Sequence, residues 1–175
     1  MNNNNKKDDK KELNIEIPLI IIQKPKIPSP IQNPMTSKIY PRCEYILNFD
    51  GCSKGNPGPA GIGAVICKSD EEIWGSCQYI GKKTNNQSEY SALIMGLKEA
   101  LSRDIKQLQV YGDSLLVINQ IKGIYKVNNK LLQELYKEAM DLVAKFEYIE
   151  LTHVYRKFNK RADELSNLGL EVCDE

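Results

Sequence analysis

From residue 44 onward, apolar positions fall into short blocks with two different periods, which predict strands and helices in a defined order. Compact or alternating apolar runs predict five strands at 45–49, 61–68, 72–80, 108–113 and 148–154. Apolar residues spaced three or four apart predict helices at 86–101, 114–121, 131–146 and after Asn159. We interpret Asn159 as the cap of the last helix, whose apolar face carries Ala162, Leu165 and Leu168. Three strands followed by alternating helices and strands indicate an α/β domain, a mixed sheet flanked by helices.

The first 42 residues have a different character. They begin with the polar, low-complexity stretch MNNNNKKDDKKELN and continue into KPKIPSPIQNP, which holds four prolines in eleven residues. Such a segment buries too little apolar surface to offset its ordering entropy. We therefore predict a disordered, Pro-rich tail over 1–42 and a folded domain over 43–175. The tail is a solubilising extension or a site for a protein partner.

Charge and cysteine content narrow the class of protein. Residues 1–42 carry 8 basic and 4 acidic side chains, and the remainder carries 16 and 19, so no global basic field attracts nucleic acid to the domain. Five cysteines without a C-x-x-C pair and a single histidine argue against a zinc site. An odd cysteine count, no signal peptide and no membrane-length apolar run predict a soluble intracellular protein. We expect a monomer that does not associate with membranes.

Four acidic residues occupy comparable places at the ends of predicted elements. Asp50 ends the first strand, Asp113 ends the fourth, and Asp163 lies in the first turn of the last helix. Glu89 shares the apolar face of its helix and should point toward the sheet. If the first and fourth strands are parallel neighbours, Asp50 and Asp113 converge where open α/β sheets bind ligands.

A cluster of four carboxylates needs cations to offset its mutual repulsion. Oxygen ligands without histidine suit Mg²⁺ or Mn²⁺, and two such ions about 4 Å apart can hold both the attacking water and the leaving oxygen of a phosphodiester. Each residue alone also has an ordinary explanation, as a turn residue, a helix cap or a partner of a helix dipole. Because the predicted topology brings all four residues together, the metal site is the favoured interpretation.

Four segments resemble the ribonuclease H family in order and spacing: FDGCSKGNPGPAGIGAV, TNNQSEYSALIMGL, VYGDSLLVINQI and HVYRKFNKRADELS. The resemblance covers residues 44 to about 170. It implies a ribonuclease H-like fold with a five-stranded mixed sheet of order 3-2-1-4-5. It also implies two Mg²⁺ ions, with Mn²⁺ as a substitute, held by Asp50, Glu89, Asp113 and Asp163. The implied reaction is hydrolysis of the RNA strand of RNA–DNA hybrids, leaving 5′-phosphate and 3′-hydroxyl ends.

The resemblance extends to substrate contacts. Asn56, Asn85 and Asn86 match positions that contact RNA 2′-hydroxyls, the group that separates RNA from DNA; the alternative is a turn-forming role. Thr84 and Asn129, with Lys82 nearby, resemble a pocket that grips a phosphate of the DNA strand.

Other positions leave two interpretations open. Cys52 contacts the sugar–phosphate backbone or is a small loop residue. His153 lies at the offset of the family's catalytic histidine, yet it stands in an apparent strand, which favours a structural role.

The chain departs from many members of the family between Asp113 and Asp163. No Lys- and Trp-rich protrusion is present, and GIYKVNNKLL takes its place. This resembles the compact archaeal and plant-type branch, in which the arginine matching Arg156 assists near the leaving group. Weak hybrid binding, helped by the basic tail, is consistent with that branch.

Three functions remain in competition. The leading one is a hybrid-specific endoribonuclease. The others are a non-catalytic module of the same fold that binds nucleic acid, and a nuclease for another duplex such as RNA–RNA. The presence of all four acidic residues argues against the binding module, but the sequence hardly separates the two nucleases.

Overall fold

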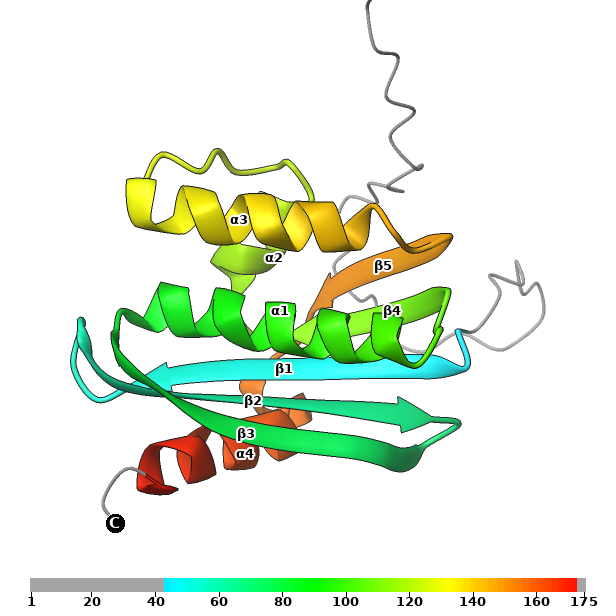
Figure 1. Cartoon of the computed structure of the whole chain (residues 1–175), viewed down its shortest axis with the longest axis horizontal. Helices are drawn as coiled ribbons and strands as arrows, with labels where there is room; N and C mark the ends of the chain where they lie inside the picture. Colours follow the sequence, from blue (N-terminus) through cyan, green and yellow to red (C-terminus); the bar gives the residue numbers. More distant parts are fainter. Residues whose placement is uncertain (1–42, 173–175) are drawn as a thin grey trace, which may run out of the picture.

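The computed structural model describes residues 43–172, which form one five-stranded sheet with helices on both faces (Figure 1). The predicted tail of residues 1–42 lies outside the described residues. The elements in chain order are β1 (Tyr45–Ser53), β2 (Gly58–Lys68), β3 (Glu71–Lys83), α1 (Asn85–Ser102), β4 (Gln107–Gly112), α2 (Leu115–Ile121), α3 (Lys130–Val143), β5 (Tyr148–His153), the 3₁₀ turn η1 (Arg156–Phe158) and α4 (Lys160–Glu171).

The sheet has the order β3-β2-β1-β4-β5, which confirms the predicted mixed sheet. Strands β1, β2 and β3 form an antiparallel meander, whereas β4 is parallel to both β1 and β5. Helices α1 and α2 lie on one face of the sheet with α3 packed on α1, and α4 covers the opposite face of β1, β2 and β3 (Figure 1). The central strand β1 therefore lies between α1 and α4.

Apolar side chains account for this arrangement. Leu47 and Phe49 of β1 pack with Val110 of β4 and with Leu93 and Leu97 of α1, all fully buried. The helical spacing of the α1 residues places them on a single face, as predicted, and that face lies on the sheet. Within the described residues, no helix is both long and apolar enough to cross a bilayer.

Two details of the prediction are wrong, and a third is confirmed only in part. Strand β1 does not end at Asp50 but continues to Ser53, because residues 50–53 pair with β2. Asn159 is the N-cap residue of α4, as predicted, but it makes no side-chain capping bond, because its amide bonds Phe49 and Asn48 instead. Leu168 is 44% exposed, since the sheet-facing side of this last part of α4 consists of Gly169 and Leu170 instead.

Candidate active site

Three carboxylates meet where β1 and β4 separate. The last residue pair of the parallel β1–β4 ladder is Phe49 with Gly112, so Asp50 and Asp113 are the next residues on the two strands. Glu89, the fifth residue of α1, reaches them from the helix above the sheet. Asp50, Glu89 and Asp113 each offer a carboxylate oxygen, and these oxygens all lie within 4.8 Å of one another.

Burial sets the electrostatics of this cluster. Asp50 is 5% exposed and Glu89 is 4% exposed. Burial raises the pKa of Asp50 to about 6, an effect increased by the charges of Asp113 and Asp163 and opposed by a hydrogen bond from Ser166. Burial also raises the pKa of Glu89 well above its usual value, and Asp50 and Asp113 raise it further. Negative charge at this site is therefore costly without a cation.

The donor set fits a divalent metal ion. All three groups supply oxygen, the ligand type that Mg²⁺ and Mn²⁺ prefer. The Oδ1 atom of Asp113 is buried and has no hydrogen-bond partner among the described residues. An orphaned buried oxygen is rare in folded proteins and calls for an explanation such as a bound ion. A cation coordinated here would satisfy Oδ1 of Asp113 and offset the raised pKa values of Asp50 and Glu89.

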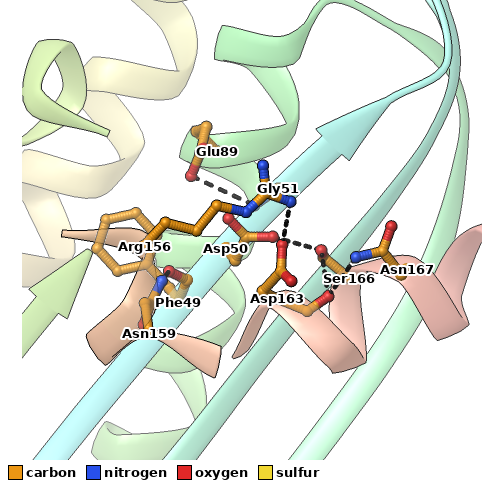
Figure 2. Close-up of polar contacts among 9 residues, drawn as sticks. All are labelled: Phe49, Asp50, Gly51, Glu89, Arg156, Asn159, Asp163, Ser166 and Asn167. Carbon is orange, nitrogen blue, oxygen red and sulfur yellow. Dashed lines mark hydrogen bonds and ion pairs between the residues drawn. The ribbon is translucent and has the colours of Figure 1, made fainter. Parts of the chain in front are cut away.

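The fourth predicted carboxylate, Asp163, lies at the rim. It is in the first turn of α4, as predicted, but it is not among the oxygens within 4.8 Å of one another. Its side chain is 25% exposed, and the Arg156 guanidinium donates to its Oδ1. Figure 2 shows Arg156 extending from η1 toward Asp163 and Asp50. The Asp163 carboxylate raises the pKa of Arg156 and keeps this cation beside the cluster.

Two polar side chains for which the sequence predicted no role in the site join the start and body of α4 to β1. Asn159 is 1% exposed; its amide donates to the Phe49 carbonyl at 2.8 Å and accepts from Asn48 at 3.0 Å. Ser166, fully buried, donates through its hydroxyl to Oδ2 of Asp50 (Figure 2). The one available signal for Ser166 was its position on the apolar face of α4, one residue after Leu165 and three after Asp163.

Close backbone contacts fix the helices against the strand that carries Asp50. A Cβ atom on Gly51 would lie 2.2 Å from the Ser88 carbonyl carbon in α1, and one on Gly63, which pairs with Asp50, would lie 2.4 Å from the Ser166 nitrogen in α4. Only glycine permits these approaches. The Gly51 N–H also donates to Oε2 of Glu89 at 3.2 Å, which orients that carboxylate.

The asparagines predicted to contact RNA lie together at one edge of the site. Asn56, in the β1–β2 turn, accepts a hydrogen bond from the Asn85 backbone N–H at 3.1 Å, and both residues are exposed. Asn86 follows in the first turn of α1 and is partly exposed. Cys52 is a partly exposed residue of β1, and burial raises the pKa of its thiol.

The residues predicted to grip a phosphate are located at helix starts. Thr84 is the N-cap of α1 in a complete capping box, and Asn129 is the N-cap of α3, bonding the Leu131 N–H at 2.8 Å. Lys82 is exposed near the end of β3. An open groove of about 560 Å³ between the starts of α1 and α3 is lined partly by Lys83 and Lys130. Thr84 and Asn129 thus have structural capping roles whether or not they bind phosphate.

His153 is the last residue of β5, so the prediction that it lies on a strand is confirmed. Its Nε2 atom lies 3.1 Å from the Asp113 carbonyl oxygen, and its ring packs edge-on against Tyr155. Among residues 43–172, the imidazole therefore has its polar contact with the backbone of a cluster residue and not with a carboxylate.

Comparisons with known proteins identify a matching family profile and several relatives of this chain. The family profile described as "Reverse transcriptase-like" matches residues 48–169. Ribonuclease HI of Halobacterium salinarum is 40% identical over 124 residues, and ribonuclease H of Pseudomonas syringae is 32% identical over 141 residues. The second match covers 71% of this chain and 91% of the relative. A bifunctional protein of Mycobacterium tuberculosis is 41% identical over 132 residues, which are 74% of this chain but 36% of that protein. The halobacterial match likewise spans 62% of its relative.

Solved structures agree with the sequence matches. The crystal structure of the Halobacterium salinarum RNase H1 superimposes with a TM-score of 0.71 at 38% identity, covering 73% of this chain and 98% of that one. LC11-RNase H1, solved in complex with an RNA/DNA hybrid, gives a TM-score of 0.70 at 34% identity, covering 75% and 99%. Since sequence, strand order and three-dimensional similarity all lead to the same group of proteins, this chain belongs to the ribonuclease H family.

Proposed function

We propose that this protein is an endoribonuclease that hydrolyses the RNA strand of RNA–DNA hybrids. The observation that carries the proposal is the cluster of buried Asp50 and Glu89 with half-buried Asp113, whose Oδ1 atom has no hydrogen-bond partner among the described residues, in a chain of the ribonuclease H family. A related structure, LC11-RNase H1, was solved with an RNA/DNA hybrid. Cleavage leaves a 5′-phosphate and a 3′-hydroxyl.

The site would hold two divalent ions, Mg²⁺ or its substitute Mn²⁺. Their ligands would be Asp50, Glu89, Asp113 and Asp163. The chemistry that such a pair supplies when bound is a deprotonated water for attack and charge neutralisation at the leaving oxygen. Asp50 has the central place, because it neighbours Glu89 and Asp113 in the cluster and its pKa responds to Asp163. The Gly51 N–H and the Ser166 hydroxyl orient the carboxylates of Glu89 and Asp50.

The side chains around the cluster supply positioning. Arg156 is an exposed cation at the start of η1 that pairs with Asp163 and could instead bind a phosphate oxygen, so we assign it the auxiliary role. Asn56 and Asn85 hold the β1–β2 turn against the start of α1. We propose that the side chains of Asn56, Asn85 and Asn86 contact 2′-hydroxyls, the feature that distinguishes the RNA strand. Thr84, Asn129 and Lys82 are the proposed contacts to a phosphate of the DNA strand.

The test is cleavage of a labelled RNA–DNA hybrid of about 12–20 base pairs, long enough to cover a duplex-binding face. Wild type should cut only the RNA strand, in Mg²⁺ and in Mn²⁺, and EDTA should abolish cutting. Asp113→Asn keeps the shape of the side chain but removes a charged ligand, so it should fold and bind hybrid without cutting it. Equal cleavage by wild type and Asp113→Asn would refute the site.

Matched RNA–RNA and DNA–DNA duplexes separate the remaining functions. Preferential cutting of RNA–RNA would reassign the substrate while keeping the site. Binding of hybrid by folded protein without cutting in either metal would favour the non-catalytic module.

We also propose that residues 1–42 are a separate tail that adds affinity for the hybrid. The tail carries a net charge of +4, against −3 for the remainder. Lysines that neutralise phosphates make binding salt-dependent. Deleting 1–42 should therefore weaken hybrid binding at low salt and reduce its salt dependence while leaving the fold intact. Loss of the folded state on deletion would contradict the proposed boundary.

A further inference from the structure

We infer that Ser166 is a positioning residue for the proposed metal site, which it serves by fixing the carboxylate of Asp50. The inference rests on the proposed function insofar as Asp50 is taken to be a metal ligand. Ser166 is fully buried, lies on the face of α4 that packs on the sheet, and donates its hydroxyl to Oδ2 of Asp50 (Figure 2).

The position of this hydroxyl is set by backbone contacts. A Cβ atom on Gly63 would lie 2.4 Å from the Ser166 nitrogen, and one on Gly61 would lie 2.2 Å from the Ser166 carbonyl oxygen. The α4 backbone therefore sits directly on β2 at this residue, and the Ser166 side chain has little freedom to move away from Asp50. Asp50 itself pairs with Gly63 across the β1–β2 ladder.

The role of Ser166 depends on which acceptor its hydroxyl donates to. A serine hydroxyl has one proton, and a serine inside a helix commonly donates it to a carbonyl of the preceding turn. Here the Asp163 carbonyl offers that alternative at 2.9 Å. The carboxylate of Asp50 is the stronger acceptor because it carries charge and is shielded from water. Ser166 therefore holds one oxygen of Asp50 and leaves the other lone pairs of that carboxylate for a cation.

The bond also links the buried cluster to the rim. Ser166 lies one helical turn after Asp163, and its hydroxyl reaches both the side chain of Asp50 and the backbone of Asp163. Outer partners of this kind orient metal-ligating carboxylates, and their removal commonly costs about 10- to 100-fold in metal affinity or activity.

Ser88 provides a matched control. It is also fully buried and lies in a helix that packs on β1, and its hydroxyl donates to the Asn85 carbonyl at 2.7 Å. Ser88 precedes Glu89 in sequence, but its hydrogen bonds in the described part of the chain go to backbone carbonyls only. Ser88→Ala thus removes a buried helical hydroxyl near the cluster without removing a bond to a carboxylate.

The experiment is a calorimetric titration of Mn²⁺ into the full chain, for wild type, Ser166→Ala, Ser166→Cys and Ser88→Ala. Urea unfolding in EDTA measures the stability of each variant without metal. Ser166→Ala should lower Mn²⁺ affinity by about 10-fold. Ser166→Cys, which keeps a donor at the same position but a weaker one on a larger atom, should fall between it and wild type. Ser88→Ala should keep wild-type affinity, although both alanine variants lose a buried hydrogen bond.

The readout separates this inference from the proposed function. Unchanged Mn²⁺ affinity in folded Ser166→Ala overturns the positioning role, whatever the cleavage assay gives. Equal losses of affinity in Ser166→Ala and Ser88→Ala also overturn it, because the effect would then be general to the fold. If wild type binds Mn²⁺ and Ser166→Ala binds it more weakly, yet wild type cuts no hybrid, the inference stands and the proposed function fails.

Discussion

The buried carboxylates and the rim of the site are held in different ways. Asp50, Glu89 and Asp113 lie close together on elements of the central core, and the two most buried are oriented by Ser166 and by the Gly51 N–H. Asp163 lies on the first turn of α4 and pairs with Arg156, whose side chain is 70% exposed. The buried group is preorganised for a cation at a cost in stability, whereas the rim pair can exchange partners when substrate arrives.

The largest effect should come from Glu89→Gln, which removes a buried charge and keeps the shape. Cleavage of the hybrid should fall by about 10³-fold or more, the scale at which losing a group that acts on the transition state is felt. Stability should be kept or raised, because the repulsion among the three carboxylates is relieved. Initial cleavage rates and thermal unfolding measure the two quantities.

Glu99→Gln is the control for that variant. Glu99 lies on the same helix but pairs with Arg103 away from the cluster, so its change should leave cleavage unaltered. If Glu89→Gln retained a tenth of wild-type activity, the buried carboxylates would contribute no more to cleavage than the rim pair, which would contradict the comparison.

The next effect concerns stability and pH in the absence of metal. The folded pKa of Asp50, about 6, is raised above the unfolded value, so the folded state binds more protons than the unfolded state between about pH 4 and 6. The contribution of Asp50 to stability is present below pH 4 and is lost as the pH rises to 6. In EDTA, wild type should therefore lose up to roughly 3 kcal/mol relative to Asp50→Asn across this range.

Urea unfolding at several pH values measures this difference, and saturating Mn²⁺ should reduce it. If the free energy of unfolding of wild type and Asp50→Asn changed equally with pH in EDTA, burial of the Asp50 charge would not destabilise the fold.

A smaller effect is expected at the rim. Arg156→Ala should lower cleavage by about 10-fold, the size of one lost charge-assisted bond, with Arg156→Lys intermediate. Arg161→Ala is a matched control, since Arg161 also lies near the start of α4 but pairs with Glu72 instead. If Arg161→Ala lowered cleavage as much as Arg156→Ala, general positive charge would explain the loss.

The smallest effect is expected for His153→Ala. Its ring contacts the Asp113 carbonyl, so the variant should lose about 1 kcal/mol of stability and only a few-fold in cleavage. Steady-state rates and urea unfolding on the same preparation decide between the roles. A larger loss of activity than in Arg156→Ala would reverse the assignment and make His153 the auxiliary residue.

Much of this arrangement could be predicted from local patterns. The apolar run 45–49 and the helical spacing of Leu93 and Leu97 indicate a central strand covered by α1, and the acidic residues following two strands indicate their convergence. The extension of β1 to Ser53 could not be predicted, because an Asp–Gly pair such as Asp50–Gly51 favours a turn locally. Pairing with β2 overrides that preference.

The links between α4 and β1 were beyond sequence reasoning for a different reason. Asn159 is separated from Phe49 by 110 residues, and Ser166 from Asp50 by 116. A polar residue before a helix is ordinarily a cap, and a serine inside one ordinarily bonds its own backbone. Only the docking of α4 on the sheet turns both side chains toward β1. This is why the polar links between α4 and β1 were the least predictable part of the site.

The backbone contacts at Gly51 and Gly63 have a consequence for how the site tolerates amino-acid substitutions. The main chain of α1 touches β1 at Gly51, and the main chain of α4 touches β2 at Gly63. The first contact sets the spacing between Glu89 and Asp50, and the second sets the spacing between Ser166 and Asp50, by van der Waals radii and not by side-chain volume. Substitutions elsewhere in the core can alter packing without changing these spacings. The two glycines thus fix the distances between the side chains of the site. An alanine at either one would change those distances more than most substitutions in the core.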